Sequence, residues 1–238
     1  MDLINIDRSP HESTRSHVYR VMKTNIMTLQ LPPGASLSEQ EIATTLSVSR
    51  TPVREAFIHL AQEHLLEIVP QRGTSVSLID LNSVEESKFL RETLEKSIIR
   101  LACKEFPADK LFDLQSFISV QELCLPGNNY LKFYELDELL HRTIFDGCNK
   151  GRIWGLIQQL GTHYNRVRLL NLSSGQDLGQ LLEHHKNLVR AIQTRDAALG
   201  SRTITLHLNK VQIDILNLVQ EHASYFKQPE LFFQKNPS

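Results

Sequence analysis

Four side chains in the second half of the chain are of the types that hold transition metals. Asp137 and His141 are four residues apart, so they share one face of a helix. His185 and His207 each fall on an apolar stripe spaced by three or four residues, which turns both imidazoles toward a core. One histidine in such a place is usually an ordinary core residue. An aspartate with three histidines favours a divalent metal, first of all Zn²⁺ and otherwise Ni²⁺ or Mn²⁺, because unpaired burial is costly and this donor set suits these ions.

A second group of residues, near the N-terminus, could bind nucleic acid. Arg50 and Arg54 are four residues apart on a helix that follows a tight turn. A guanidinium fork suits guanine O6 and N7 or a phosphate, and Ser49 and Thr51 with the first free N–H groups of the helix suit a phosphate. Taken alone, two arginines at this spacing more often form a solvated helix face. The elements around them favour DNA binding.

Those elements predict a winged helix-turn-helix. Ser38 and Glu41 form a capping box before the middle helix, and a β-hairpin turns at Arg72 and Gly73, where a backbone without a side chain can approach a groove closely. The expected elements are helices over 16–30, from Ser38 onward and over 50–64, and strands over 66–70 and 74–78.

Beyond residue 78 nearly everything follows a 3.6-residue period, which predicts a helical bundle. The fold class is therefore mainly α, with a winged helix-turn-helix domain over 1–78 and an all-helical domain over 79–238. The expected bundle helices cover 83–105, 108–123, 129–147, 150–171, 177–195 and 197–225.

Charge and composition narrow the class of protein further. The 238 residues carry a net charge of −1, and residues 1–78 hold seven Lys/Arg against eight Asp/Glu. DNA binding must therefore depend on a few well-placed cations rather than on bulk charge. There is no apolar run of membrane-spanning length, no signal-peptide pattern and no C-x-x-C pair among three cysteines, so we expect a cytoplasmic protein with no membrane partner and plain thiols.

The first half resembles the GntR family of bacterial regulators. The resemblance rests on Leu31-Pro-Pro-Gly34, on Val48-Ser-Arg-Thr-Pro-Val-Arg-Glu-Ala56 and on Pro70-Gln-Arg-Gly73. It implies DNA contacts at Arg50, Arg54 and Gly73. Gln40 stands where the family often has a DNA-contacting arginine. The loss of that charge predicts a salt dependence shallower by about one phosphate equivalent.

The second half resembles the FadR-type branch, whose ligand domain is called FCD. The resemblance assigns Asp137, His141, His185 and His207 as metal ligands, and it leaves His184 aside because the family usually has Glu there. It also implies two effector-binding residues. The first is Arg91, as a carboxylate clamp, for which the alternative is a surface ion pair with Glu95; the second is Asn149. The segment 163–168 offers further polar groups that could complete a pocket.

Together these features predict a transcription regulator, acting as a repressor, that binds a near-palindromic operator as a homodimer. A small organic or sugar acid would bind between the metal and Arg91 and control DNA binding. The alternative is a metal-dependent hydrolase or lyase with an accessory nucleic-acid domain. Around the helix, Glu138 lies about 100° and Glu135 about 160° from Asp137, so neither is well placed as its general base.

Overall fold

The computed structural model describes residues 3, 4, 6–175 and 177–230, with 211–214 in backbone only. It divides into two compact units. The first holds the chain up to Leu81 together with the segment from Val219 onward, and the second runs from Asn82 to Leu218. These limits differ from the expected division at 78 and 79, because the end of the chain belongs with the first unit.

A short parallel bridge explains why the C-terminal segment belongs there. The backbone N–H of Ile79 donates to the carbonyl of Tyr225 at 2.8 Å, and that of Lys227 donates to the carbonyl of Ile79 at 2.9 Å. Both Ile79 and Phe226 are buried. The apolar surface of Phe226 and two backbone hydrogen bonds thus hold this segment beside the end of the wing.

The first unit is a winged helix-turn-helix, which confirms the predicted architecture. Its elements are α1 (Thr14–Met27), β1 (Ser36–Leu37), α2 (Glu39–Thr45), α3 (Arg50–Gln62), β2 (Leu66–Val69) and β3 (Gly73–Val76). The sheet is antiparallel in the order β1-β3-β2, with Ser36 opposite Ser75 and Val69 opposite Gly73. Two residues are too short to show a period, so β1 was not predicted. It forms because β3 has a free edge.

Local capping and packing place α3 as the sequence predicts. The side chain of Ser38 accepts a hydrogen bond from the N–H of Glu41 at 3.4 Å, which begins α2. Ser47, with φ of 55°, makes the tight turn between α2 and α3. The inner face of α3, including Phe57 and Leu60, is fully buried against α1 and the sheet. The outer face, with both arginines, is left exposed.

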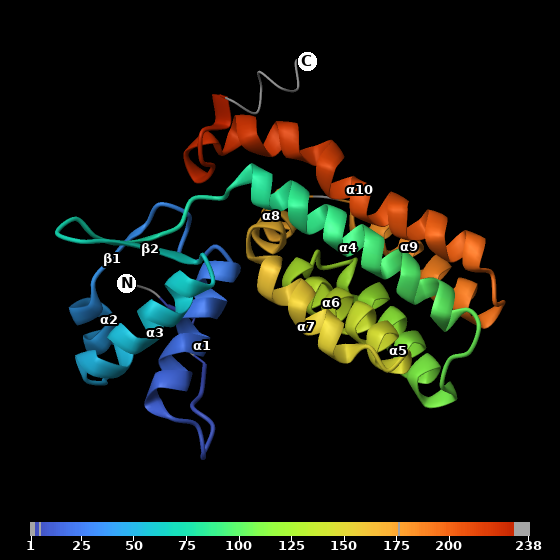
Figure 1. Ribbon diagram of the computed structural model, residues 1–238, viewed down its shortest axis with the longest axis horizontal. Helices are drawn as coiled ribbons and strands as arrows, with labels where there is room; N and C mark the ends of the chain where they lie inside the picture. The colour runs from blue at the N-terminus through green and yellow to red at the C-terminus, as the bar shows by residue number, and fades with distance from the viewer. Residues whose placement is uncertain (1–2, 5, 176, 231–238) are drawn as a thin grey trace. The chain divides into compact units, whose positions relative to one another are not determined.

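The second unit is a helical bundle, as predicted (Figure 1). Its helices are α4 (Leu81–Ala102), α5 (Ala108–Cys124), α6 (Tyr130–Gly147), α7 (Gly151–Leu160), α8 (Thr162–Ser173), α9 (Leu178–Gln193) and α10 (Ala197–Glu221). The 3₁₀ turn Ala223–Tyr225, which follows α10, belongs to the first unit. In the described part of the chain, every helix is too short or too polar to cross a bilayer.

The prediction of one helix over 150–171 was wrong. The chain breaks at Gly161 into α7 and α8, where a Cβ would lie 2.8 Å from the carbonyl oxygen of Ile157. The two helices also need different surroundings. The buried residues of α7 are Trp154 and Ile157, whereas α8 is buried on all sides from Thr162 to Leu172. A straight helix could not pass from the edge of the bundle to its centre.

Two helical glycines test this packing. A Cβ on Gly200 of α10 would lie 2.7 Å from Cγ1 of Ile99 on α4, whereas one on Gly155 of α7 would meet open space. We expect Gly200→Ala to lower the free energy of unfolding by about 1–3 kcal/mol through overpacking. Gly155→Ala should raise it by about 0.5–1 kcal/mol, because alanine favours a helix interior. Chemical denaturation of both variants measures the difference, and equal stabilities would contradict the close approach of α10 to α4.

Candidate metal centre and nucleic-acid interface

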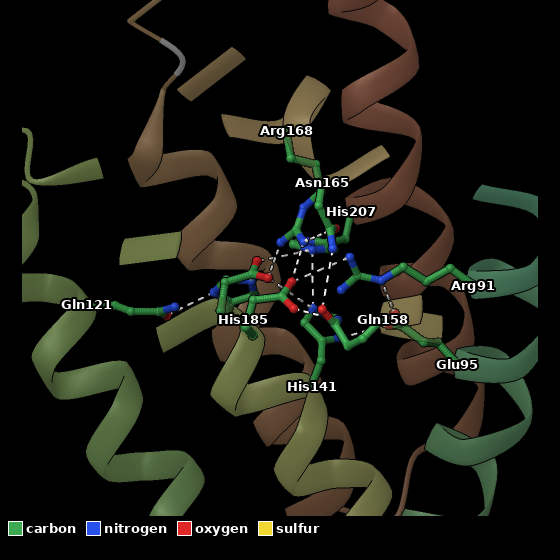
Figure 2. Close-up of polar contacts among 11 residues, drawn as sticks. Arg91, Glu95, Gln121, His141, Gln158, Asn165, Arg168, His185 and His207 are labelled. Atoms are coloured by element: carbon green, nitrogen blue, oxygen red, sulfur yellow. Dashed lines mark hydrogen bonds and ion pairs between the residues drawn. The ribbon is translucent and has the colours of Figure 1, made fainter. Parts of the chain in front are cut away.

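The four predicted metal ligands meet in the core of the bundle. Asp137 and His141 come from α6, His185 from α9 and His207 from α10, and one ligand atom of each lies within 4.8 Å of the others. All four are buried. Nε2 of His185 lies 3.0 Å from Oδ1 of Asp137, and Nε2 atoms of His141 and His207 are 3.3 Å apart (Figure 2). The sequence prediction of one shared cluster agrees with this geometry.

Two neighbours hold the imidazoles with Nε2 toward the cluster. Nδ1 of His141 lies 2.7 Å from Oε2 of Glu95, and Nδ1 of His185 lies 2.8 Å from Oε1 of Gln121 (Figure 2). A ring that donates its Nδ1–H to such an acceptor presents the Nε2 lone pair to the cluster. Gln121 on α5 and Glu95 on α4 were not predicted in this role. The signal for Gln121 was available, since it is a polar residue on the buried face of α5.

The protonation states suit cation binding. Burial lowers the pKa of His185 and lowers that of His207 well below its ordinary value, so both are neutral near pH 7. Burial alone would raise the pKa of Asp137, but the positive charge of Arg168 outweighs it and keeps the carboxylate ionised. With its Nδ1–H donated to Gln121, His185 turns the lone pair of Nε2 toward Oδ1 of Asp137, 3.0 Å away. A cation between them would relieve this repulsion, so the donor set fits a divalent metal.

Arg91 lies in the core, not at the surface. It bonds to Glu95 through Nε, the partner named in the alternative of a surface ion pair, but both side chains are only 2% exposed. Nη1 lies 3.8 Å from Oε1 of Glu138, and neither Nη1 nor Nη2 has a hydrogen-bond partner among the described residues. The guanidinium lies near Tyr164, 5.7 Å from the ring centre. Such an arrangement leaves guanidinium donors open for an anion.

Arg168 is the part of the site that sequence reasoning did not single out. On α8 it bonds to the carboxylates of both Asp137 and Glu138. The hydroxyl of Tyr164, one turn earlier, has no hydrogen-bond partner among the described residues. A small cavity reaches the cluster, and Asp137, Tyr164, Arg168 and His207 line it. The predicted segment 163–168 thus contributes to the pocket because α8 runs through the middle of the bundle.

Asn149 is not brought to this cluster. It is exposed just beyond the end of α6, with φ of 56°, and its N–H donates to the carbonyl of Asp146 at 2.9 Å. Glu135 and Glu138 do not stand free beside Asp137 either. Glu135 is paired with Lys132 at 3.0 Å, and Glu138 accepts from Arg168 and from Gln158. The geometry therefore gives no support to an enzyme that uses one of them as a base.

The predicted DNA-contacting residues lie on the surface of the first unit. Ser49 precedes α3 as its N-cap residue without a side-chain capping bond, and Thr51 is exposed in the first turn of α3. Arg50 and Arg54 are 64% and 74% exposed, and both pair with Glu39 of α2, at 3.2 and 3.7 Å. Glu39 was not predicted in this role. It holds the two guanidinium groups on one side of α3.

The remaining predicted contacts lie on α2 and in the wing. Gln40 is exposed on α2, and Arg72 is exposed in the loop between β2 and β3. Gly73 has φ of +106°, a backbone conformation that residues with a Cβ rarely adopt. The wing therefore needs glycine for its backbone, and a contact of Gly73 with DNA remains a prediction.

A winged helix-turn-helix joined to a helical domain of this kind defines a DNA-binding transcription regulator. Residues 14–76 match the model of bacterial regulatory proteins of the gntR family, and residues 88–210 match the FCD domain. The chain belongs to the GntR family, in the branch that carries an FCD domain. This membership assigns transcription regulation rather than enzyme catalysis.

Relatives support the same assignment. The transcriptional repressor RspR of Escherichia coli (strain K12) is 29% identical over 92% of this chain and 96% of its own length. A regulator from an unstable DNA locus of Streptomyces ambofaciens is 30% identical over 92% and 90%. The solved structure of E. coli McbR/YncC shares the fold, with a TM-score of 0.72 and 23% identity over 89% of this chain and 99% of that one.

The role of Gln121 gives a prediction for the metal centre. In Gln121→Leu the Nδ1–H of His185 loses its acceptor, and we expect the affinity for Zn²⁺ to fall about 10–100-fold. Competition with a chromophoric chelator measures this affinity. Gln115→Leu is the control, because Gln115 is exposed on the same helix. Unchanged Zn²⁺ affinity in a folded Gln121→Leu protein would show that Gln121 does not orient a ligand.

Proposed function

We propose that this protein is a homodimeric transcriptional repressor whose operator binding is controlled by a small organic or sugar acid held beside a divalent metal, with zinc as the first candidate. One observation carries the proposal. Four buried ligand atoms converge within 4.8 Å, next to a buried arginine with two open nitrogens. The name of RspR as a repressor supports the direction of control.

Different residues of the effector site would bind the metal and the acid. Asp137, His141, His185 and His207 would hold the metal, which when bound supplies a Lewis-acidic centre with positions left for carboxylate oxygens. Arg91 would clamp the acid through Nη1 and Nη2, since a buried guanidinium binds a carboxylate more strongly than an exposed one. The hydroxyl of Tyr164 would orient the polar end of the acid.

In the first unit, different residues would contact the bases and the phosphates of DNA. Arg50 and Arg54 would read base edges in the major groove. The other predicted contacts, Gln40, Ser49, Thr51, Arg72 and Gly73, would mainly hold phosphates and set the register. A dimer would place two such units on a near-palindromic operator, because two-fold symmetry in the protein matches two-fold symmetry in the site.

Helix α10 connects the effector site to the first unit. His207 lies on α10, and α10 leads into the segment whose backbone is bonded to Ile79 just before α4. A shift of α10 on effector binding would therefore reach the residues that join the wing to the bundle. By linkage, an acid that favours the form with low DNA affinity must bind less tightly when DNA is present.

DNA binding is tested by selecting duplexes from a random-sequence library and measuring affinity by fluorescence anisotropy. We expect a near-palindromic site. The Arg50→Ala, Arg54→Ala double variant should lose about tenfold or more of the preference for it, because each bidentate contact discriminates by about 1–3 kcal/mol. The control is the Arg152→Ala, Arg202→Ala double variant, which removes the same charge from exposed positions of the second unit. Equal behaviour of the two would contradict the role given to α3.

Effector control is tested by adding small mono- and dicarboxylic and sugar acids to the Zn²⁺-loaded protein on the selected DNA. We expect at least one acid to release the DNA, and Arg91→Lys to need about tenfold more of it because lysine lacks the planar fork. Arg100→Lys, exposed on the same helix, is the control. If none of the acids changes DNA affinity, the metal is structural, and chelation should then unfold the protein rather than alter its response.

A further inference from the structure

The cations of the helix-turn-helix are mostly neutralised within the first unit. Residues 1–78 hold seven Lys/Arg in all. Arg20 is paired with Glu12 at 2.7 Å and Lys23 with Glu63 at 2.6 Å. Glu39 pairs with both arginines of α3. A cation already bonded to a carboxylate gains less from a phosphate, because the first ion pair must be broken or shared.

Three arginines of residues 1–78 form no ion pair within the part of the chain that the structure describes. Arg72 is one of them and lies at the wing tip. The other two are Arg8, which precedes α1, and Arg15, which lies in the first turn of α1. We call the segment before α1, together with this first turn, the N-terminal arm. Arg15 is exposed. In a protein with no excess of positive charge, such unpaired cations are the ones available to release counterions from DNA.

Both N-terminal arginines line the same open groove as the start of the recognition helix. Arg8, Thr14 and Arg15 line it from the N-terminal part of the chain, and Ser49 and Thr51 line it from the start of α3. One carboxylate, Glu55, also lines it. The groove therefore joins the arm to the end of α3 that would enter the major groove, and its cationic side is the arm.

The arm is ordered by its own contacts, which leave Arg15 accessible. Arg8 donates through Nε and Nη2 to the carbonyl of Glu12 at 2.9 and 2.8 Å, and the N–H of Ser9 donates to Oε2 of Glu12 at 3.2 Å. Ser13 caps α1 by accepting from the N–H of Ser16 at 3.1 Å. Opposite, the hydroxyl of Ser49 makes no capping bond. A hydroxyl without a capping role and an exposed guanidinium thus face one groove.

We propose that this groove is a second docking site for the DNA backbone, in which Arg15 binds a phosphate beside the bases read by α3. The inference rests on the proposed DNA binding and adds a residue to it. Arg8 shapes the arm and adds positive charge, and Ser49 and Thr51 bind the same stretch of backbone from the α3 side. The arm thereby supplies charge that α3 lacks because of Glu39.

The test measures affinity for the selected duplex and for unrelated sheared DNA across a series of salt concentrations. We expect Arg15→Ala to weaken both by about fivefold at physiological salt and to lower the salt slope by about one phosphate equivalent. Arg15→Lys should restore the slope, since a point charge suffices for a phosphate. Arg152→Ala, with the same loss of charge on the second unit, should change neither. Thermal unfolding verifies that the variants are folded.

A modified duplex locates the contact. Methylphosphonate replacement removes one backbone charge at a time on either side of the selected half-site. At one position, we expect the replacement to weaken the wild-type protein but not Arg15→Ala, so that the two changes together cost no more than one. The inference fails if Arg15→Ala keeps the wild-type slope or if no position shows this coupling. If the wild-type protein selects no DNA at all, it is the proposed function that fails.

Discussion

The burial of one carboxylate and three imidazoles at a single point in an apolar bundle is the constraint on which the second unit depends. Nε2 atoms of His141 and His207 lie 3.3 Å apart, and Nε2 of His185 lies 3.0 Å from the carboxylate of Asp137, so a cation or a proton among them would stabilise this buried cluster. The surrounding helices contribute side chains that contact this cluster. Glu95 on α4 and Gln121 on α5 hold two of the rings, and Arg168 on α8 balances the charge of Asp137.

The polar cluster at the centre of the bundle explains the unusual composition of α8. A helix buried on all sides is ordinarily apolar, but α8 places arginine, histidine, asparagine and tyrosine in the core. Arg168 can be buried there because two carboxylates of α6 bond to it and the rings of Tyr134 and Tyr164 lie beside its guanidinium. Arg166 and His163 are hydrogen-bonded to each other at 2.9 Å. Without those partners, the same polar groups would be costly to bury at the centre of the bundle.

The first unit follows a different electrostatic logic. With seven Lys/Arg against eight Asp/Glu in residues 1–78, it does not attract DNA by net charge, and Glu39 restrains both exposed arginines of α3. Affinity then depends on where each guanidinium stands and on the few that no carboxylate holds. Such a protein should be sensitive to salt at fewer contacts than a strongly basic regulator, and its preference among sequences should depend more on geometry.

The sequence by itself determined the two architectures, the position of α3 with its two exposed arginines, and the four side chains that converge in the bundle. Helical period, capping residues and turn glycines are local signals, and a polar residue on an apolar stripe reports its own burial, as at His185 and His207. Only the tertiary structure decided which side chains meet. It broke 150–171 at Gly161, brought Glu95 and Gln121 to the imidazoles, left Asn149 at the surface and joined Phe226 to Ile79. These outcomes depend on how segments distant in sequence pack together. The hydrophobic period along one helix shows which face is buried, but it does not show which other helix packs against that face.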